Sequence, residues 1–379
     1  MNDKELAPVQ IYAVLICLII NVLDGFDLLA IAFTANEIAI EWEMSPENLG
    51  ILFSSGLVGM IIGAFGLAPT ADTIGRRPQM VLCLFIIAFG MLASGFAASV
   101  TQLMLLRFIT GAGIGGILPS INTMVAEYAT PRWRNLSLSM MHIGYPLGVL
   151  IGGASAAYLI GAHGWRSVFL LGGSLTLFIG FVVLFFLPES LVFLLSKQPK
   201  NALAKANSLL LKLKRPLLET LPKSELSNEK VSGIGLLFSK RYLSSSILLW
   251  LAFFMCMMTQ YFLVSWLPKI LIDAGLSTNE GISAGVVMSV GGITGMLLLG
   301  VVSTRFDLVR TVNIYYAVAV IAMVGLGSLS LNLNALLVVT FIIGFLLYGG
   351  IIGWYMIGAW LYPSSIRNSG VGWAIGIGR

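Results

Sequence analysis

The sequence predicts an all-α polytopic membrane protein, and three observations support this fold class. Hydrophobic residues make up 58% of the 379 residues and charged residues only 10%, whereas a soluble domain carries about 25% charged residues. Apolar stretches long enough to cross a bilayer as helices, about 20 residues or more, recur along the chain. Polar and basic residues gather between these stretches. We therefore expect the lipid bilayer to surround most of the protein.

The expected membrane helices form two series. The first series is predicted at about 11–34, 48–68, 78–98, 101–126, 136–160 and 166–188. After a basic segment, the second series is predicted at about 244–267, 281–303, 311–330, 335–361 and from about 369 onward. Because the last helix holds only about ten residues, we expect the natural chain to complete it and to add a twelfth helix.

An internal repeat links the two series. A shift of 233 residues maps Arg77 onto Arg310 and Arg134 onto Arg367, and it maps the start of the first helix onto that of the seventh. Such parallel repeats are typical of transporters built from two bundles. We therefore expect an N-terminal six-helix bundle at 1–188, a cytoplasmic basic loop at 189–243 and an incomplete C-terminal bundle at 244–379.

The distribution of Lys and Arg predicts the orientation. Eighteen of the 22 basic residues, among them Lys4, fall in segments that share one side if the N-terminus is cytoplasmic. This asymmetry accounts for the net charge of +5 without a nucleic-acid partner. A basic amphipathic pattern at about 200–215 is expected to lie along the inner leaflet. The first apolar run is too long for a cleavable signal peptide.

Two acids in the first helix, Asp24 and Asp27, raise the main functional question. They are three residues apart and share a helix face. A charge within the bilayer costs roughly 2.5–3.5 kcal/mol on insertion scales, so such residues are usually functional. We interpret the pair as a proton-coupling site, because close carboxylates repel and one of them then exchanges protons near neutral pH. The alternative is a buried pair that is neutralised by protonation, or held by an arginine, for packing alone.

Two membrane arginines are candidate substrate ligands. Arg107 lies in the fourth helix and Arg379 in the eleventh, and an arginine there must meet an anion or water. Arg107 has an alternative role as a fixed ion partner of Asp24 or Asp27. No acid in the other second-series helices could pair with Arg379, so we expect it to bind a substrate carboxylate bidentately.

Aromatic residues supply the rest of the expected substrate site. The fifth helix carries His142 and Tyr145, and the candidates in helices 7 and 10 are Tyr261, Trp354 and Tyr355. Such rings could stack on a planar ligand. The alternatives are a packing role for the histidine and an interfacial or packing role for the aromatics.

A cluster of both charge signs is expected on the cytoplasmic side. It comprises Asp72, Arg76 and Arg77 of "ADTIGRR", with Glu127, Arg134, Glu189 and Arg367. We interpret it as an ion-pair gate that closes the inside while the outside is open. The alternative is a set of solvated loop charges that only fix topology. Three cysteines without CxxC spacing and two scattered histidines predict no metal site, and no cofactor is expected.

The chain resembles the major facilitator superfamily and, within it, the aromatic acid:proton symporter family. The resemblance rests on "ADTIGRR", "LPES", "DGFD" in the first helix, "GAGIGGILPSINTMVAEYATPRWR" in the fourth and "GVGWAIGIGR" in the eleventh. Thr73 stands where the superfamily usually has arginine, and Ala68 where glycine is usual. The second copy of the loop, "GVVSTRFDLVR", has Thr304 where an acid is usual.

The resemblance implies proton-coupled import of an aromatic carboxylic acid or a related ring-cleavage dicarboxylate across the bacterial cytoplasmic (inner) membrane. The range would include hydroxybenzoate, protocatechuate, benzoate and muconate. It also implies that the important charges are Asp24, Asp27, Arg107, Glu127, Arg367 and Arg379. The expected partners are a small organic acid anion, protons and the lipid bilayer, and a monomer is expected. An exporting proton antiporter and a non-transporting acid sensor remain as alternatives, whereas no nucleophile–base pair suggests an enzyme.

Overall fold

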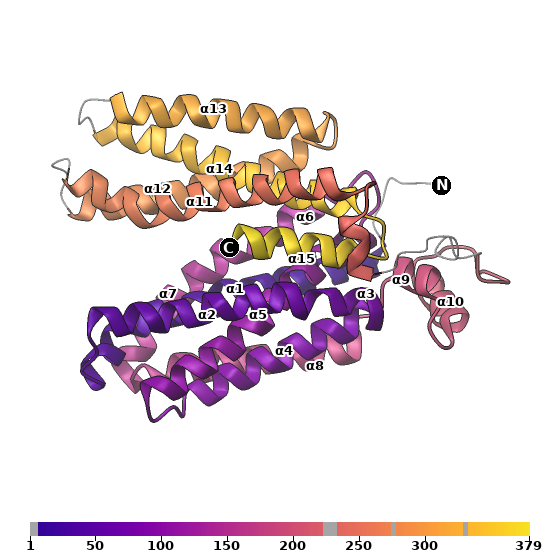
Figure 1. Cartoon of the computed structure of the whole chain (residues 1–379), viewed down its shortest axis with the longest axis horizontal. Coiled ribbons are helices and arrows are strands. Elements are labelled where there is room, and N and C mark those ends of the chain that lie inside the picture. The colour runs from indigo at the N-terminus through magenta and orange to yellow at the C-terminus, as the bar shows by residue number, and fades with distance from the viewer. Residues whose placement is uncertain (1–6, 223–232, 274–277, 329–332) are drawn as a thin grey trace.

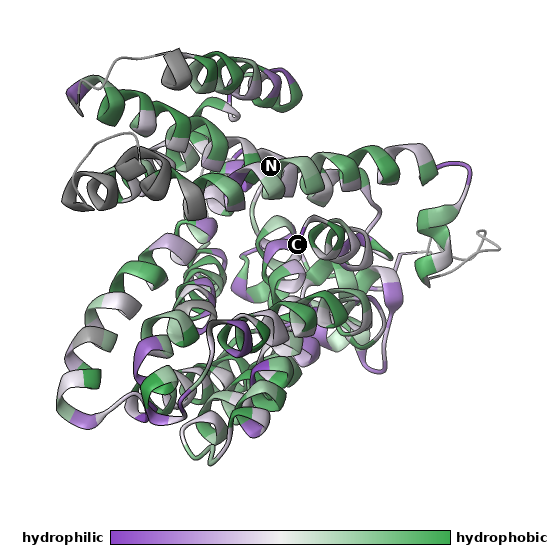
Figure 2. Ribbon diagram, turned by 60° about the vertical axis from the view of Figure 1, so that its left-hand side comes forward, coloured by the Kyte–Doolittle hydropathy of each residue, from purple (hydrophilic) through white to green (hydrophobic). Residues whose placement is uncertain are grey.

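The computed structural model describes residues 7–222, 233–273, 278–328 and 333–379. Lys4 and residues 223–232 of the basic loop, whose basic side chains support the predicted orientation, lie outside this part. In the described part, ten helices are long and apolar enough to cross a membrane. The predicted all-α, polytopic membrane fold is confirmed. Hydrophilic residues gather toward the ends of the helices and the connections between them (Figure 2).

The first series contains the spans predicted from the sequence and two short helices after them. Its elements are α1 (Pro8–Glu41), α2 (Pro46–Gly66), the 3₁₀ turn η1 (Ala68–Thr70), α3 (Ala71–Ile74), α4 (Arg76–Ser94), α5 (Val100–Tyr128), α6 (Arg134–His142), α7 (Gly144–His163), α8 (Arg166–Phe186), α9 (Leu191–Lys197) and α10 (Ala202–Lys212). Helix α10 lies within the amphipathic pattern at about 200–215.

The second series follows a 3₁₀ turn. Its elements are η3 (Gly233–Phe238), α11 (Leu243–Asp273), α12 (Thr278–Val302), α13 (Leu308–Ser328), α14 (Leu333–Leu361) and α15 (Arg367–Gly378). Helix α14 starts and ends 233 residues after α5, and α15 starts 233 residues after α6. These offsets support the proposed repeat.

The fifth predicted helix differs from expectation. It is interrupted at Ile143, between α6 and α7. Pro146 in the first turn of α7 has no backbone N–H to donate to the preceding turn, which favours a break there. The carbonyl oxygen of Met141, in the last turn of α6, accepts a hydrogen bond from Asn21 Nδ2 of α1 at 2.9 Å.

The helices form two groups (Figure 1). Helices α1 to α8 make one group, α11 to α14 the other, and α15 lies between them. The helices α3, α9 and α10 lie at one end of the molecule, which we call the α3 end. Contacts between the groups join α6 to α12 and α14, and α15 to α2, α3 and α5.

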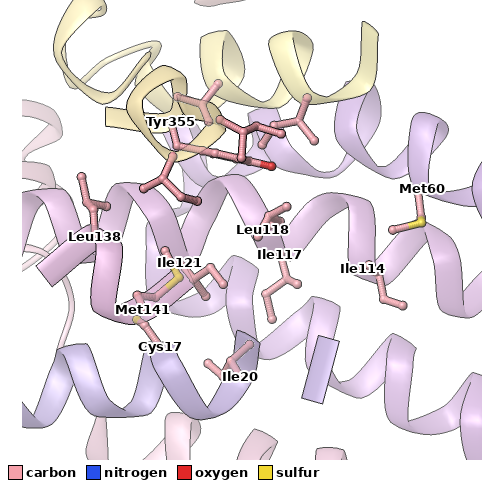
Figure 3. Close-up of a cluster of buried hydrophobic side chains, with 14 of the residues drawn as sticks. Cys17, Ile20, Met60, Ile114, Ile117, Leu118, Ile121, Leu138, Met141 and Tyr355 are labelled. Atoms are coloured by element: carbon pink, nitrogen blue, oxygen red, sulfur yellow. The ribbon is translucent and has the colours of Figure 1, made fainter. Parts of the chain in front are cut away.

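The first helix approaches α7 unusually closely. A Cβ atom on Gly25 would collide with the carbonyl oxygen of Tyr145, so only glycine fits between the two acids of "DGFD". The core beside this contact joins α1, α5 and α6. Cys17 and Ile20 face Ile121 and Met141, and Tyr355 of α14 lies across α5 (Figure 3).

Candidate functional site

A buried acid and a half-buried arginine lie near each other at the boundary of the two helix groups. Asp24 is 4% exposed, and neither of its carboxylate oxygens has a hydrogen-bond partner. Arg379, at the end of α15, is half-buried, and its Nε and Nη1 atoms are buried and unpartnered. Each lies within electrostatic range of the other. Buried charges without hydrogen bonds are costly, which indicates a place where a ligand or a proton completes the site.

Tyrosines surround the Asp24–Arg379 pair. The side chains of Tyr145, Tyr261 and Tyr355 all lie within electrostatic range of the Arg379 guanidinium. Tyr145 is half-buried, and Tyr261 is 41% exposed. The structure therefore brings together four residues assigned to the substrate site and one of the two acids assigned to proton coupling. We call these five residues the central site.

His142 lies at the edge of the central site rather than in it. Its ring is 4.3 Å from that of Tyr355 between centroids, and its Nε2 lies 3.1 Å from Asn122 Oδ1. Asn122 Nδ2 also donates to the carbonyl oxygen of Tyr355 at 3.4 Å. This arrangement links α5 and α6 to α14 and fits a positioning role for the histidine.

Trp354 is not part of the central site. Its ring stacks on Tyr316 of α13 at 6.1 Å between centroids, and it lines a separate cavity of about 250 Å³ with Cys256. Consecutive helix residues point about 100° apart, so Trp354 and Tyr355 face different neighbours.

The second acid, Asp27, has its own surroundings. It is 1% exposed and accepts a hydrogen bond from Thr176 of α8 at 3.3 Å. Arg107 donates to the backbone carbonyl of Asp27 at 2.9 Å and lies over the ring of Phe169, 5.8 Å from its centroid. Arg107, assigned to substrate binding from the sequence, therefore lies beside Asp27 inside the first helix group and apart from Arg379.

At the α3 end, one glutamate bridges the two helix groups. Glu127 Oε1 accepts from Arg76 Nη2 at 3.1 Å and from Arg367 Nη1 at 2.8 Å. Arg76 is fully buried and also donates to the carbonyl of Ser364 at 2.6 Å. Arg134 lies within electrostatic range of Glu127 and Arg367.

An aspartate caps α15 across the same boundary. Asp72 accepts hydrogen bonds from the backbone N–H groups of Asn368 and Ser369, at 3.3 and 2.8 Å, and from the Ser369 hydroxyl at 2.7 Å. A carboxylate at a helix N-terminus is favourable because the first N–H groups there have no partner within the helix. Asp72 is 3% exposed, so it is not a solvated loop charge.

Glu189 and Arg77 stay within the first group. Glu189 accepts from the backbone N–H of Arg76, Arg77 and Ser190, while burial raises the pKa of its carboxyl. Gly75 has a φ of 111°, and a Cβ there would meet the Glu189 carboxylate, so the turn of "ADTIGRR" requires glycine. Arg77 Nη2 donates to the carbonyl of Leu184.

Several functional candidates were missed in the sequence. Asn122 is a fully buried amide in an apolar helix, a pattern that usually marks function in a membrane and could have identified it. Asn368 and Ser369 sit at the start of a predicted helix, and the hydroxyl of Thr176 carries no distinguishing signal. In the described part of the chain, no group of three or more His, Cys, Asp or Glu side chains could hold a metal ion.

Solved structures with the same architecture include transporters of known fold. A double tryptophan mutant of XylE matches with a TM-score of 0.77 at 17% identity, covering 99% of this chain and 86% of that one. The proton:xylose symporter XylE bound to 6-bromo-6-deoxy-D-glucose matches with a TM-score of 0.74 at 18% identity, covering 97% and 86%. These similarities establish the fold.

Curated relatives cover the whole chain. The 4-hydroxybenzoate transporter PcaK of Acinetobacter baylyi is 34% identical over 100% of this chain and 84% of its own length. The gallate transporter of Pseudomonas putida is 33% identical with the same coverage, and the benzoate transport protein of Acinetobacter baylyi is 25% identical over 100% and 82%. The sequence profile of the Major Facilitator Superfamily matches residues 15–378. The chain therefore belongs to the Major Facilitator Superfamily and is a membrane transporter, not an enzyme, in one family with these relatives.

Proposed function

We propose that the protein imports an aromatic carboxylate, or a related ring-cleavage dicarboxylate, together with at least one proton across the bacterial cytoplasmic membrane. The relatives named for 4-hydroxybenzoate, gallate and benzoate support this substrate class. One observation carries the proposal: the unpartnered Asp24 carboxylate lies opposite Arg379 among tyrosines, between the two helix groups.

The central site suits a planar anion. The Arg379 guanidinium offers free N–H groups and can bind a carboxylate bidentately. Tyr145, Tyr261 and Tyr355 supply ring faces for an aromatic ring and hydroxyls for its polar substituents. Since such a site is mainly apolar with a few placed polar groups, it has the usual character of a small-molecule site.

Proton coupling follows from charge balance. Without substrate, the Asp24 carboxylate and the Arg379 guanidinium neutralise each other in the buried site. A substrate carboxylate on Arg379 would leave a net negative charge, and a proton on Asp24 restores neutrality. Protonation also frees Arg379 from its acid partner. Substrate anion and proton are therefore expected to bind together.

Asp27 is proposed as a second protonatable group. Its contacts with Thr176 and Arg107 fit a role in passing or holding a proton rather than in touching substrate. The two acids, predicted from the sequence to act as one pair, are therefore proposed to have different roles.

Alternating access provides the transport step. With the N-terminus cytoplasmic, the α3 end faces the cytoplasm. The hydrogen bonds of Glu127 and Asp72 to α15 and Arg367 then close the inside while the central site faces outward. Substrate and proton binding would favour rocking of the two groups, loss of these contacts and release inside.

Uptake of labelled 4-hydroxybenzoate into proteoliposomes tests the proposal. An inward proton gradient should drive accumulation by the full-length protein. Asp24→Asn should abolish gradient-driven accumulation yet keep exchange of substrate, and Arg379→Lys should raise KM about tenfold or more because the bidentate fork is lost. The exposed acid variant Glu47→Gln is the matched control. Gradient-driven accumulation by Asp24→Asn at the wild-type rate would contradict the proton role.

A further inference from the structure

A second cavity lies at the α3 end, away from the central site. Its volume is about 540 Å³, and it is enclosed by the α3–α4 turn, the end of α8, α9 and α10. Its charged lining residues are Arg77, Glu189, Lys205 and Lys212. No step of the proposed transport cycle uses the two lysines.

One face of α10 supplies the cationic wall. Lys205, Ser208 and Lys212 line the cavity, and their spacing of three and four residues places them on one helix face. The buried residues of α10 are Ala202, Ala206, Leu209 and Leu210, and Leu209 also lines the cavity. In the described part of the chain, neither lysine takes part in an ion pair.

The cavity carries excess positive charge. Three cations and one acid line it. The Glu189 oxygens accept from the backbone N–H groups of Arg76, Arg77 and Ser190, and among the described residues Glu189 makes no ion pair with either lysine. The net charge of the lining is therefore positive, which favours an anionic ligand.

The remaining lining and the surroundings are apolar. Ile74, Phe193 and Leu194 line the same cavity. Arg77 binds the carbonyl of Leu184 at the end of α8, where Phe185 and Phe186 are 71% and 65% exposed. Exposed apolar side chains at the end of a membrane helix face lipid in a membrane protein. The cavity therefore opens where the bilayer surface meets the protein.

We infer that this cavity binds the phosphate group of an anionic phospholipid, with its acyl chains along the outer face of α8. Arg77, Lys205 and Lys212 would hold the phosphate oxygens, and the apolar lining would pack against the glycerol and the first methylenes. The amphipathic α10 would thereby be pinned to the α3–α4 turn. The inference does not depend on the transported substrate.

Native mass spectrometry of the purified full-length protein in detergent tests the inference, with phosphatidylglycerol and phosphatidylcholine as probes. The wild type should bind phosphatidylglycerol more tightly than phosphatidylcholine. Lys205→Gln with Lys212→Gln should weaken that binding about thirtyfold, because each of the two lost basic groups contributes about 1 kcal/mol near an anionic headgroup. Lys200→Gln with Lys214→Gln removes the same charge from exposed positions outside the cavity and should change binding less than twofold.

Three outcomes would overturn the inference. Equal losses in the two double variants would mean that only the overall charge of the loop matters. Equal binding of the two lipids would remove the phosphate selectivity. Binding of glycerol 3-phosphate as tightly as phosphatidylglycerol would make the occupant a soluble phosphate ester. Circular dichroism and gel-filtration profiles that match the wild type are required of both variants, and Lys205→Arg with Lys212→Arg should retain binding.

Discussion

The two junctions between the helix groups differ in chemistry although the repeat relates them. The ionic junction joins α3, α4 and α5 to α15 through Asp72, Arg76, Glu127, Arg367, Asn368 and Ser369. The neutral junction joins α12 to α6 through Asn135, Ser139, Gly300 and Ser303. The first is held by buried charge, the second by close packing.

The neutral junction has a single cross-group hydrogen bond among the described residues. Asn135 Nδ2 donates to the carbonyl of Ser303 at 3.2 Å, and Gly300 lies directly against Ser139. The hydroxyl of Thr304 donates within its own segment, to Val301. The nearby acid Asp307 accepts from the backbone N–H of Arg310 and caps α13, so its carboxylate is engaged within the second group.

The difference suggests a division of labour at the α3 end. Ion pairs and capped helix ends break abruptly, because a half-broken buried pair leaves an uncompensated charge. Packed small residues slide with little change in energy. We therefore propose that the ionic junction sets when the inside opens, while the neutral junction guides the movement.

The largest effect is expected at Glu127. In Glu127→Gln the buried Arg76 and Arg367 lose their shared carboxylate, which costs about 3–5 kcal/mol for a buried pair. Uptake should fall more than about tenfold and the Tm should drop. A cysteine introduced at Ser365, which is buried next to α15, reports opening of the α3 end (Ser365→Cys). Maleimide labelling of this cysteine should rise in Glu127→Gln. Unchanged labelling and an unchanged Tm would show that the ionic junction does not keep the α3 end closed.

A smaller loss is expected at Asp72. Asp72→Asn removes the negative charge at the α15 N-terminus, worth about 1–2 kcal/mol as a helix cap. The same cysteine should label several-fold faster than in the wild type. Asn135→Ala is the matched change in the neutral junction, where one neutral hydrogen bond contributes about 1 kcal/mol or less. If Asn135→Ala accelerates labelling more than Asp72→Asn does, the order of the two junctions is reversed.

The smallest effect is expected when the neutral junction is made ionic. Thr304→Asp places an acid at the exposed position next to Ser303, whose carbonyl accepts from Asn135 of α6, and a carboxylate there should stabilise the closed arrangement by about 0.3–1 kcal/mol. Uptake should slow about twofold and cysteine labelling should slow with it. Thr304→Asn, without the charge, is the control. Faster labelling in Thr304→Asp would show that an acid at this position does not stabilise the closed arrangement.

The helices were predictable from the sequence because they follow from local hydrophobic patterns. The ionic cluster was predictable because membrane topology places its loops on one side. Helix α5, predicted at about 101–126, spans Val100–Tyr128, since long apolar periodic runs leave few alternatives. Three of the residues assigned to the gate, Arg76, Glu127 and Arg367, do meet, because loops on one side of a membrane share a small area. Their buried geometry, with Arg76 fully enclosed, depends on packing that the sequence does not encode locally.

The central site was only partly predictable. Asp24 and Asp27 share a face of α1 by spacing and lie within electrostatic range of each other, yet Asp24 lies near Arg379 of α15 and Asp27 contacts α8, so tertiary contacts give them different neighbours. The spacing of Trp354 and Tyr355 shows that they point about 100° apart, but it does not show which of them faces the site. Asp24 as the acid near Arg379 could not be predicted, since no local pattern shows which first-series helix packs near the end of α15.

The interruption at Ile143 bears on how the protein moves. Helix α6, before it, packs against α12 and α14 of the other group as well as against α1 and α5, whereas α7, after it, packs mainly against α1. A continuous helix through this position would force both sets of contacts to shift together. With the interruption, α6 can adjust against α12 and α14 while α7 keeps Tyr145 beside Gly25. The central site can then keep its shape while the α3 end opens.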